Sequence, residues 1–599
     1  MDGSTRRSSG SVAALCFIAA ATAAAQAGAA APPLPPTPGE WTMPGRTPDL
    51  QRYSPLTQIT RANVKGMRVA WQFSTGVLRG HEGAPLVVGT VLYVHTPFPN
   101  AVYALDLSKP GAPMLWKHVP PQPAEGIPVD CCDLVNRGLA YHPSGKLFIE
   151  LLAGDLLALD AKTGKVLWRV PNGDYKTGAT TTGAPIVIKD LVIAGVSGGE
   201  FGVRGRVTAY DVNTGKEVWR AYSTGPDSAV KLAAPANEFY PSMQEKDLGV
   251  STWPGDEWMR GGGTTGGWYS YDPVLNLFYY GTGSPGTWNP DQRPGDNKWS
   301  ATIFARNPDN GETRWAYQIT PHDEWGYDGV NENVLVDIII GGKPVKALVH
   351  FDRNGFAYTL DRTNGKVLVA EPYGQGVNWA SKVDLATGVP VRNTQYATSS
   401  KKNTAAICPA AIGAKDQQPS AYSPQTGWFY VPTNNVCMDY EGVDVKYSPG
   451  QSYVGAIVRM FAGPGGNRGR VIAWDPTVGK VRWEIKENLA AYGGALTTAG
   501  GLVFYGTMEG WLKAVDQKSG AVLWQFKTGS GITGNPISFL GPDAKQYVAV
   551  LSGIGGWAGI GVAGAIGPDD PTAGLGALGA FSDAATFSNQ GGILTVFSL

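Results

Sequence analysis

A short pattern of apolar and polar positions recurs along the chain and predicts pairs of β-strands. Apolar and polar residues alternate up to an Asp, a turn containing Gly follows, and a Trp stands four or five residues after the Gly. Alternation with a period of two predicts strands, and Gly supplies the positive φ that such turns need. The clear copies are Ala158–Trp168, Ala209–Trp219, Ala473–Trp483 and Ala514–Trp524, and the weaker ones are Ala104–Trp116, Ala305–Trp315, Thr359–Val369 and a tail at Trp71.

The spacing of these eight units predicts the fold. Uninterrupted copies lie 41–54 residues apart, which is the size of a four-stranded propeller blade. Chance hairpins do not explain a pattern that recurs at seven or eight places. We therefore predict an all-β fold, an eight-bladed β-propeller of four-stranded antiparallel blades with tryptophan docking, forming a single domain over residues 28–599. The intervals Trp219–Trp315 and Val369–Trp483 are about twice as long, which indicates inserted loops, where function usually resides.

Composition and the N-terminal segment limit the possible partners and the cellular location of the protein. The net charge is zero, so the chain offers no basic field for nucleic acid. Arg6 and Arg7 precede an apolar run over 12–25 and an Ala-Gln-Ala site at 25–27, which predicts a signal peptide over residues 1–27 and export to the periplasm. A membrane anchor is the alternative, but the apolar run is short and a Pro-rich segment follows it. No later segment is apolar enough to span a membrane.

Four cysteines remain after the predicted cleavage, and an even number in an exported protein suits two disulfides. They are Cys131, Cys132, Cys408 and Cys437. Since no Cys-x-x-Cys pair is present, neither a zinc ribbon nor a c-type haem attachment is predicted. Cys408 and Cys437 enclose a loop inside the second long interval, as a structural bridge would. Cys131 and Cys132 are neighbours, and they are either bridged to each other or reduced and buried.

The stretch His-Asp-Glu-Trp-Gly-Tyr-Asp-Gly, residues 322–329, holds three acids and a histidine, although only 16% of all residues are charged. An acidic cluster is most often a solvated loop. This one follows Trp315 directly, where one repeat unit ends and the next begins. A reaction centre or a metal site is therefore the competing interpretation.

Several long strings give the chain a family resemblance. "GHEGAPLVV", "DCCDLVNRGLAY", "GVRGRVTAYDVNTG", "RPGDNKW", "PHDEW", "DRNGFAYTLDR" and "GGWAGIGV" resemble the quinoprotein alcohol dehydrogenases, and among them the soluble methanol dehydrogenase type. The resemblance implies oxidation of methanol or another small primary alcohol to an aldehyde. It also implies pyrroloquinoline quinone (PQQ), one Ca²⁺ or lanthanide ion, a periplasmic cytochrome c as electron acceptor, and a possible homodimer.

The resemblance also implies a set of residues for the quinone. In the family a disulfide between adjacent cysteines, here Cys131 and Cys132, covers one face of PQQ. Arg137 matches a position that binds a PQQ carboxylate, and Arg353 one near the reactive carbonyls, where a fixed positive charge stabilises developing negative charge. The implied cofactor-binding residues are Glu82, Cys131, Cys132, Arg137, Thr182, Ser197, Gly198, Gly199, Thr264, Arg353, Asn434 and Trp557.

The resemblance further implies the metal ligands Glu200, Ser284 and Asp328, and the catalytic residues Asp328 and Arg353. Hard oxygen ligands suit Ca²⁺ or a lanthanide, and a bound cation acts as a Lewis acid on the quinone. An acid at the position of Asp328 resembles the lanthanide-using branch, because an additional carboxylate suits a trivalent ion.

The chain departs from the family at four positions. Gly326 replaces the Asp that serves as catalytic base, and Gly266 replaces the Trp that stacks on the quinone. Ser284 replaces an Asn ligand, and Tyr492 replaces a Trp near the substrate. One interpretation is an active enzyme with altered substrate or metal preference, in which the two glycines leave room for a bulkier alcohol and Asp328, Asp323 or Glu324 acts as the base. The other is a catalytically impaired PQQ- and metal-binding propeller with a sensing or regulatory role.

Overall fold

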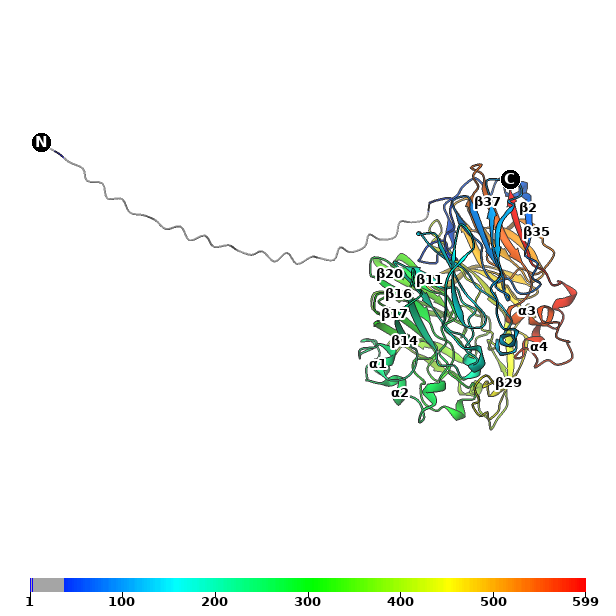
Figure 1. Cartoon of the computed structure of the whole chain (residues 1–599). Coiled ribbons are helices and arrows are strands. Elements are labelled where there is room, and N and C mark those ends of the chain that lie inside the picture. The colour runs from blue at the N-terminus through cyan, green and yellow to red at the C-terminus, as the bar shows by residue number, and fades with distance from the viewer. Residues whose placement is uncertain (2, 4–36) are drawn as a thin grey trace.

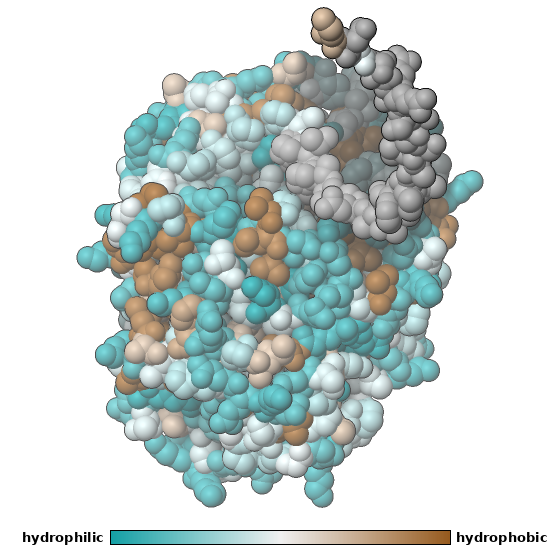
Figure 2. All heavy atoms as spheres, turned by 90° about the vertical axis from the view of Figure 1, so that its left-hand side faces the viewer, coloured by the Kyte–Doolittle hydropathy of each residue, from teal (hydrophilic) through white to brown (hydrophobic). Residues whose placement is uncertain are grey.

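The structure is a computed structural model that describes residues 1, 3 and 37–599. The predicted signal peptide, residues 1–27, lies almost entirely outside the described residues. Within the part of the chain that is described, no helix is long and apolar enough to cross a membrane. Hydrophilic side chains cover most of the face shown in Figure 2, and the apolar ones lie there in small separate groups.

Eight sheets, each built on four antiparallel strands and here called blades 1 to 8, confirm the predicted propeller (Figure 1). In blade 7 a short fifth strand, β1 (Tyr53–Ser54), pairs in parallel at the edge. Blades 1 to 4 consist of β3 (Leu86–Val88), β4 (Val91–His95), β5 (Val102–Asp106) and β6 (Met114–His118); β7 (Ala140–His142), β8 (Lys146–Glu150), β9 (Asp155–Asp160) and β10 (Val166–Pro171); β11 (Ile186–Ile188), β12 (Leu191–Ala194), β13 (Arg206–Asp211) and β14 (Glu217–Tyr222); and β15 (Ser270–Asp272), β16 (Leu277–Gly281), β17 (Thr302–Arg306) and β18 (Thr313–Gln318).

Blades 5 to 8 complete the ring. They consist of β19 (Asn333–Ile340), β20 (Lys343–Phe351), β21 (Phe356–Asp361) and β22 (Lys366–Pro372); β26 (Ala421–Ser423), β27 (Trp428–Asn434), β30 (Gly469–Asp475) and β31 (Lys480–Glu487); β32 (Ala495–Thr498), β33 (Leu502–Gly506), β34 (Trp511–Asp516) and β35 (Val522–Lys527); and β36 (Ile537–Leu540), β37 (Gln546–Ser552), β38 (Ile593–Ser598) and β2 (Arg68–Ser74). Because blade 8 pairs β2 with three strands from the C-terminal end, both ends of the propeller are fastened in one sheet.

The repeated Trp and Gly of the sequence pattern meet between neighbouring blades. The ring of Trp168 lies so close to Gly215 of the next unit that a Cβ added there would be 2.8 Å from it, and its indole N–H donates to the carbonyl of Val212 at 3.1 Å. Trp219 lies against Gly311 and donates to Pro308 in the same way. Gly is therefore required at this turn for its positive φ and for the indole that covers it.

The two long intervals hold several elements that lie outside the blades. The first contains α1 (Asp227–Val230) and α2 (Leu248–Ser251), and the second contains β23 (Ala380–Asp384), β24 (Val389–Arg392) and the sheet of β25 (Thr404–Ile407), β28 (Val436–Gly442) and β29 (Ala456–Ala462). A disulfide joins Cys408 to Cys437 and ties β25 to β28, as predicted. The helices α3 (Gly556–Ala563) and α4 (Ala577–Phe581) lie between β37 and β38.

Antiparallel connectivity explains where the site is found. In a four-stranded antiparallel sheet, the connection between the second and third strands and the chain leaving the fourth strand emerge at the same end. Glu200, Ser284 and Arg353 lie in connections of the first kind, in blades 3, 4 and 5, and Arg137 and Asp328 lie in connections of the second kind. Residues from distant repeats are thus collected at one end of the ring.

Candidate active site

In the acidic stretch 322–329, two of the three acids hold the loop together, and the third acid is available to the rest of the site. The carboxylate of Asp323, which is fully buried, accepts hydrogen bonds from the backbone N–H groups of Trp325, Gly326 and Tyr327 at 3.0–3.1 Å. Glu324 forms an ion pair with Arg392 at 2.6 Å. A solvated loop is therefore the wrong interpretation, and the first two acids are engaged in holding the loop together.

Asp328, the third acid, is the one that meets the other predicted residues. Its Oδ2 lies 3.1 Å from Nη1 of Arg353, and its Oδ1 accepts a hydrogen bond from the backbone N–H of Ser284 at 2.5 Å. Burial and, after it, the negative charge of Asp328 raise the pKa of Glu200 to about 7. The structure thus brings together Glu200, Ser284, Asp328 and Arg353, the predicted metal and catalytic residues.

A second group forms around Arg137. Its Nε lies 3.2 Å from Oε2 of Glu82, and its Nη1 donates to Oγ1 of Thr182 at 3.0 Å. Oγ1 of Thr182 is in turn 3.2 Å from Oγ of Ser197. Glu82 is buried, and burial raises its pKa to about 8 although the charge of Arg137 opposes the shift. Four of the predicted cofactor-binding residues therefore form one continuous polar network.

The adjacent cysteines are bonded and are linked to the rest of the site. Cys131 and Cys132 form a disulfide with an S–S distance of 2.12 Å. Asp133, the next residue, accepts a hydrogen bond from the backbone N–H of Gly556 at 2.9 Å. Trp557 follows Gly556, and the guanidinium of Arg353 lies 5.5 Å from the centre of its ring. This chain of contacts connects the disulfide to Arg353.

Two further predicted residues occupy supporting positions. The side-chain amide of Asn434 donates to the carbonyls of Ile412 and Gly413 at 3.4 and 3.2 Å, so it holds the loop that precedes Asp416. Thr264 lies close to Gly283, where a Cβ would be 2.9 Å from its Oγ1 and 3.2 Å from Oδ1 of Asp328. Thr264 therefore lies beside the carboxylate of Asp328. Asn434 supports the site indirectly, through the backbone carbonyls of Ile412 and Gly413.

Sequence reasoning missed Asp416. Its Oδ1 lies 2.5 Å from Nη2 of Arg353, and its Oδ2 accepts a hydrogen bond from the hydroxyl of Tyr492. Arg353 is thus held between two carboxylates, Asp328 and Asp416. The available signal was the string Lys415-Asp416-Gln417, which places charged residues in a long interval that lacks the repeat pattern.

The two glycines that replace family residues differ in their surroundings. Gly326 has φ of +78°, and a Cβ there would be 3.0 Å from the indole of Trp288, so a side chain would need strained backbone and movement of that ring. Gly266 has no positive φ, and the nearest obstacle to a Cβ is the rotatable hydroxyl of Ser197 at 2.3 Å. Both positions thus have less free room than two glycines suggest, but at Gly266 the backbone φ is unstrained and the atom nearest to an added Cβ can rotate away.

His95 supports the Glu82–Arg137 group and allows a test by pH. It is buried, its Nε2 is 3.3 Å from the carbonyl oxygen of Asn136, and its ring lies against Gly83. Burial lowers the pKa of His95 to about 4. Between pH 6.5 and 4 the unfolded chain therefore binds more protons than the folded one, and this residue makes the protein less stable as pH falls.

We expect the His95→Gln variant to lose less stability than the wild type when the pH falls from 7 to 5, by about 2 kcal/mol, since Gln does not titrate and can still donate to Asn136. Urea unfolding at both pH values measures the difference. His81 and His322 also have a pKa lowered to about 4 by burial, but they are present in both proteins and cancel. An identical pH dependence in the two proteins would contradict the buried neutral state of His95.

Comparison with known proteins agrees with this geometry. Residues 41–371 and 484–548 match the sequence model of the PQQ glucose/ethanol/alcohol dehydrogenase β-propeller domain. The chain is 56% identical over 568 residues to the lanthanide-dependent methanol dehydrogenase of Methylacidiphilum fumariolicum (strain SolV), covering 94% of this chain and 93% of that protein. It is 48% identical over 571 residues to subunit 1 of the methanol dehydrogenase [cytochrome c] of Methylorubrum extorquens (strain ATCC 14718 / DSM 1338 / JCM 2805 / NCIMB 9133 / AM1), covering 93% and 91%.

Among solved structures, a europium-containing methanol dehydrogenase superposes with a TM-score of 0.93 at 55% identity, covering 94% of this chain and 99% of that one. The family match spans more than half of the chain, and the curated relative is matched along nearly its full length. The chain therefore belongs to the PQQ-dependent glucose/ethanol/alcohol dehydrogenase family, in the group that contains the lanthanide-dependent methanol dehydrogenases.

Proposed function

We propose that the protein oxidises a small primary alcohol to an aldehyde, using PQQ and one bound Ca²⁺ or lanthanide ion. The observation that carries the proposal is the meeting of Asp328, Arg353 and Glu200 at the end of the ring where the disulfide-linked Cys131 and Cys132 are also found. The relatives named above as methanol dehydrogenases support the same reaction class.

Buried polar atoms without hydrogen-bond partners support the proposal that the site binds PQQ. Among the described residues, Nε of Arg353 and both polar side-chain atoms of Gln417 are buried without a hydrogen-bond partner, and Nε of Arg137 has only its ion pair with Glu82. Buried donors and acceptors are normally satisfied, so an additional polar group fits here. Guanidinium groups suit the carboxylates of PQQ. Arg137, Thr182 and Ser197 would hold its polar edge, with the disulfide over one face.

The donors available for a cation are the carboxylates of Glu200 and Asp328 and the hydroxyl of Ser284. The negative charge of Asp328 disfavours ionisation of Glu200, a bound cation would offset this effect, and all three groups are hard oxygen donors. When bound, PQQ and the cation together supply the acceptor for the hydride of the alcohol carbon. Gly326 adds no oxygen to this set.

The chain's own contribution is proton removal and charge placement. Asp328 is positioned to accept the hydroxyl proton of the alcohol, because Asp323 and Glu324 are occupied within the loop. Arg353 holds Asp328 on one side and Asp416 on the other, which fixes its guanidinium for developing negative charge. We also propose that the protein works in the periplasm, in keeping with the signal peptide that the sequence predicts, and that it passes electrons to a cytochrome c, as the name of the Methylorubrum relative suggests.

The alternative is a PQQ-binding propeller with little or no activity, and Gly326 is the observation that favours it. Both are tested by loading the purified protein with PQQ and either Ca²⁺ or a light lanthanide, followed by a dye-linked assay with methanol and longer primary alcohols. Oxidation with either ion supports the enzyme. If the protein binds PQQ but oxidises no alcohol with either ion, the PQQ-binding propeller without activity is the correct function. If it does not bind PQQ, both candidate functions are excluded.

The Gly266→Trp variant should bind PQQ about 5- to 150-fold more tightly than the wild type. A stacked indole contributes on the order of 1–3 kcal/mol per ring, and the hydroxyl of Ser197 can rotate away to admit the side chain. Quenching of intrinsic fluorescence during PQQ titration measures the affinity. Gly529→Trp is the matched control, since nothing lies within 4 Å of a Cβ at that glycine. Equal affinities in all three proteins would show that position 266 does not face the quinone.

A further inference from the structure

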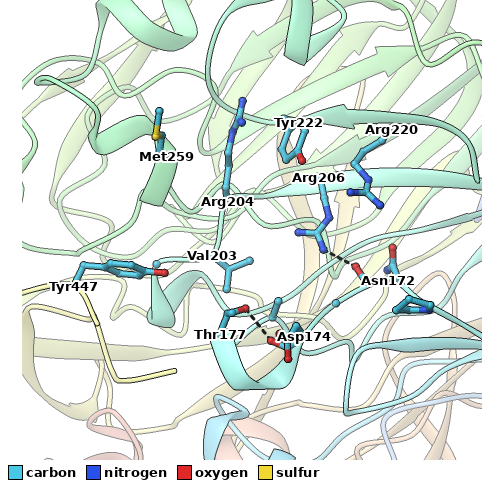
Figure 3. Close-up of a pocket in the computed structure, with 14 residues that line it drawn as sticks. Asn172, Asp174, Thr177, Val203, Arg204, Arg206, Arg220, Tyr222, Met259 and Tyr447 are labelled. Carbon is cyan, nitrogen blue, oxygen red and sulfur yellow. Dashed lines mark hydrogen bonds between the residues drawn. The ribbon is translucent and has the colours of Figure 1, made fainter. Parts of the chain in front are cut away.

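A hollow of about 490 Å³ lies beside blade 3, outside the group of residues described above (Figure 3). The end of β13 and β14 forms one wall, with Arg206, Arg220 and Tyr222, and the turn that follows β10, with Asn172 and Asp174, forms another. Gly202, Val203 and Arg204, which follow Glu200 and Phe201 in the chain, also line it, and so do Met259 and Tyr447. This is the size range of pockets that bind small molecules.

Strand register places two guanidinium groups on the same face of blade 3. Arg206 of β13 is opposite Tyr222 of β14, and Thr208 is opposite Arg220. Since residues two apart on a strand share a face, Arg206 and Arg220 lie side by side, and both turn into the hollow (Figure 3). Arg204, at the rim, stacks on Tyr222 with its guanidinium 4.0 Å from the ring centre.

The charge on this wall is not balanced. The side chain of Arg206 donates one hydrogen bond, at 2.5 Å to the carbonyl of Asn172, and has no ion pair with any described residue. Arg220 has one ion pair, with Glu217 at 2.7 Å. The Nε atoms of both are buried and have no hydrogen-bond partner in the described part of the chain. The pKa of Arg206 is lowered by burial and then by the neighbouring charge of Arg220. A half-buried cation without a counter-charge is less favourable than a paired one, so a bound anion would stabilise Arg206.

The remaining lining shows what kind of ligand would fit. Asp174 is the one acid among the described lining residues, and its carboxylate already accepts the backbone N–H of Lys176 at 3.0 Å. The aromatic rings of Tyr222 and Tyr447 and the side chains of Met259 and Val203 supply apolar surface. Guanidinium groups bind planar carboxylates with paired hydrogen bonds and stack on aromatic rings.

We propose that this hollow is a binding site for a small organic anion that carries carboxylate groups on an apolar, planar body. Arg206 and Arg220 bind a carboxylate through their free N–H groups, Arg204 contributes charge at the rim, and the tyrosine rings cover the apolar part. The site is separate from the quinone group and does not rest on the proposed reaction. It shares with that group only the segment that runs from Glu200 to Arg204.

Calorimetric titration of the full chain with isophthalate at low ionic strength tests the site. Isophthalate should bind, whereas isophthalamide, its uncharged analogue of the same shape, should not. Arg206→Gln and Arg220→Gln should each weaken binding about tenfold or more, because each removes hydrogen bonds between charged groups. Arg314→Gln, an exposed arginine of β18 in the next blade, is the matched control and should leave the affinity unchanged.

Hydrogen exchange locates the ligand independently of any variant. Isophthalate should slow exchange in the segments 172–178 and 202–206, which contain residues that line the hollow, and should do so in the protein without PQQ. The proposal is overturned if no binding is observed, if isophthalamide binds equally well, or if both arginine variants fold and retain wild-type affinity. Tighter binding of inorganic phosphate than of isophthalate would also overturn it, since the ligand would then not be an organic carboxylate.

Discussion

The Asp328→Asn variant, loaded with PQQ and a cation, should oxidise alcohols on the order of 10²- to 10⁴-fold more slowly than the wild type, the range expected for loss of a positioned base. Asn is close to Asp in size but cannot accept the hydroxyl proton. The neighbouring acids cannot replace it, because Asp323 binds three backbone N–H groups and Glu324 binds Arg392. The rate constant kcat in the dye-linked assay measures the effect.

Two controls separate this role from general damage. Glu312→Gln removes an exposed acid from the turn before β18 and should leave kcat unchanged. The absorbance of bound PQQ in Asp328→Asn should match the wild type, which shows that the quinone site is intact. If Asp328→Asn retains full activity while Glu200→Gln loses it, Asp328 is not the base and serves at most as a ligand.

The fold could be predicted from the sequence because its unit is local and repeated. At five blade boundaries a Trp meets a Gly of the next unit, as Trp168 meets Gly215, so the same pair of residue types recurs along the sequence. The sequence pattern contained no comparable rule for the long intervals. Their lengths located the insertions, but the sheet of β25, β28 and β29 could not be predicted, since its strands lie far apart in the chain and lack the repeat.

The site was predictable in its residue types but not in its contacts. Family motifs located Asp328 and Arg353, yet the choice among three acids in one stretch required knowledge of which carboxylates the backbone already occupies. Asp416 was missed because it reaches Arg353 from a segment 63 residues away. The surroundings of Gly326 and Gly266 could not be predicted either. The sequence shows that a side chain is missing, but it shows neither the backbone φ nor the atoms that lie against each glycine.

Arg206 and Arg220 show the same limit outside the quinone group. Both belong to a repeat unit that was recognised, and the strand positions of the two arginines follow from the pattern. Nothing in the spacing shows that Arg206 has no acidic partner, because the acids that could reach it come from other connections of the ring. Charge balance at a site is a property of the assembled blades, whereas strand register is a property of one repeat.

The Trp315→Ala variant should lower the free energy of unfolding by about 3–5 kcal/mol, the cost of removing a large buried aromatic side chain. Trp315 is buried, its ring lies 2.6 Å from a Cβ placed on Gly365, and its indole N–H donates to the carbonyl of Arg362 at 3.0 Å. Truncation therefore opens a cavity between blades 4 and 5 and removes one of the two donors to that carbonyl, the other being the hydroxyl of Tyr279 at 3.1 Å. Urea unfolding of the full chain measures the loss.

Trp168→Ala is the matched comparison, because Trp168 makes the same two contacts but is only half-buried, and its truncation should lower the free energy of unfolding by less. Equal losses at the two positions would show that the hydrogen bond, rather than burial of the ring, is what joins the blades.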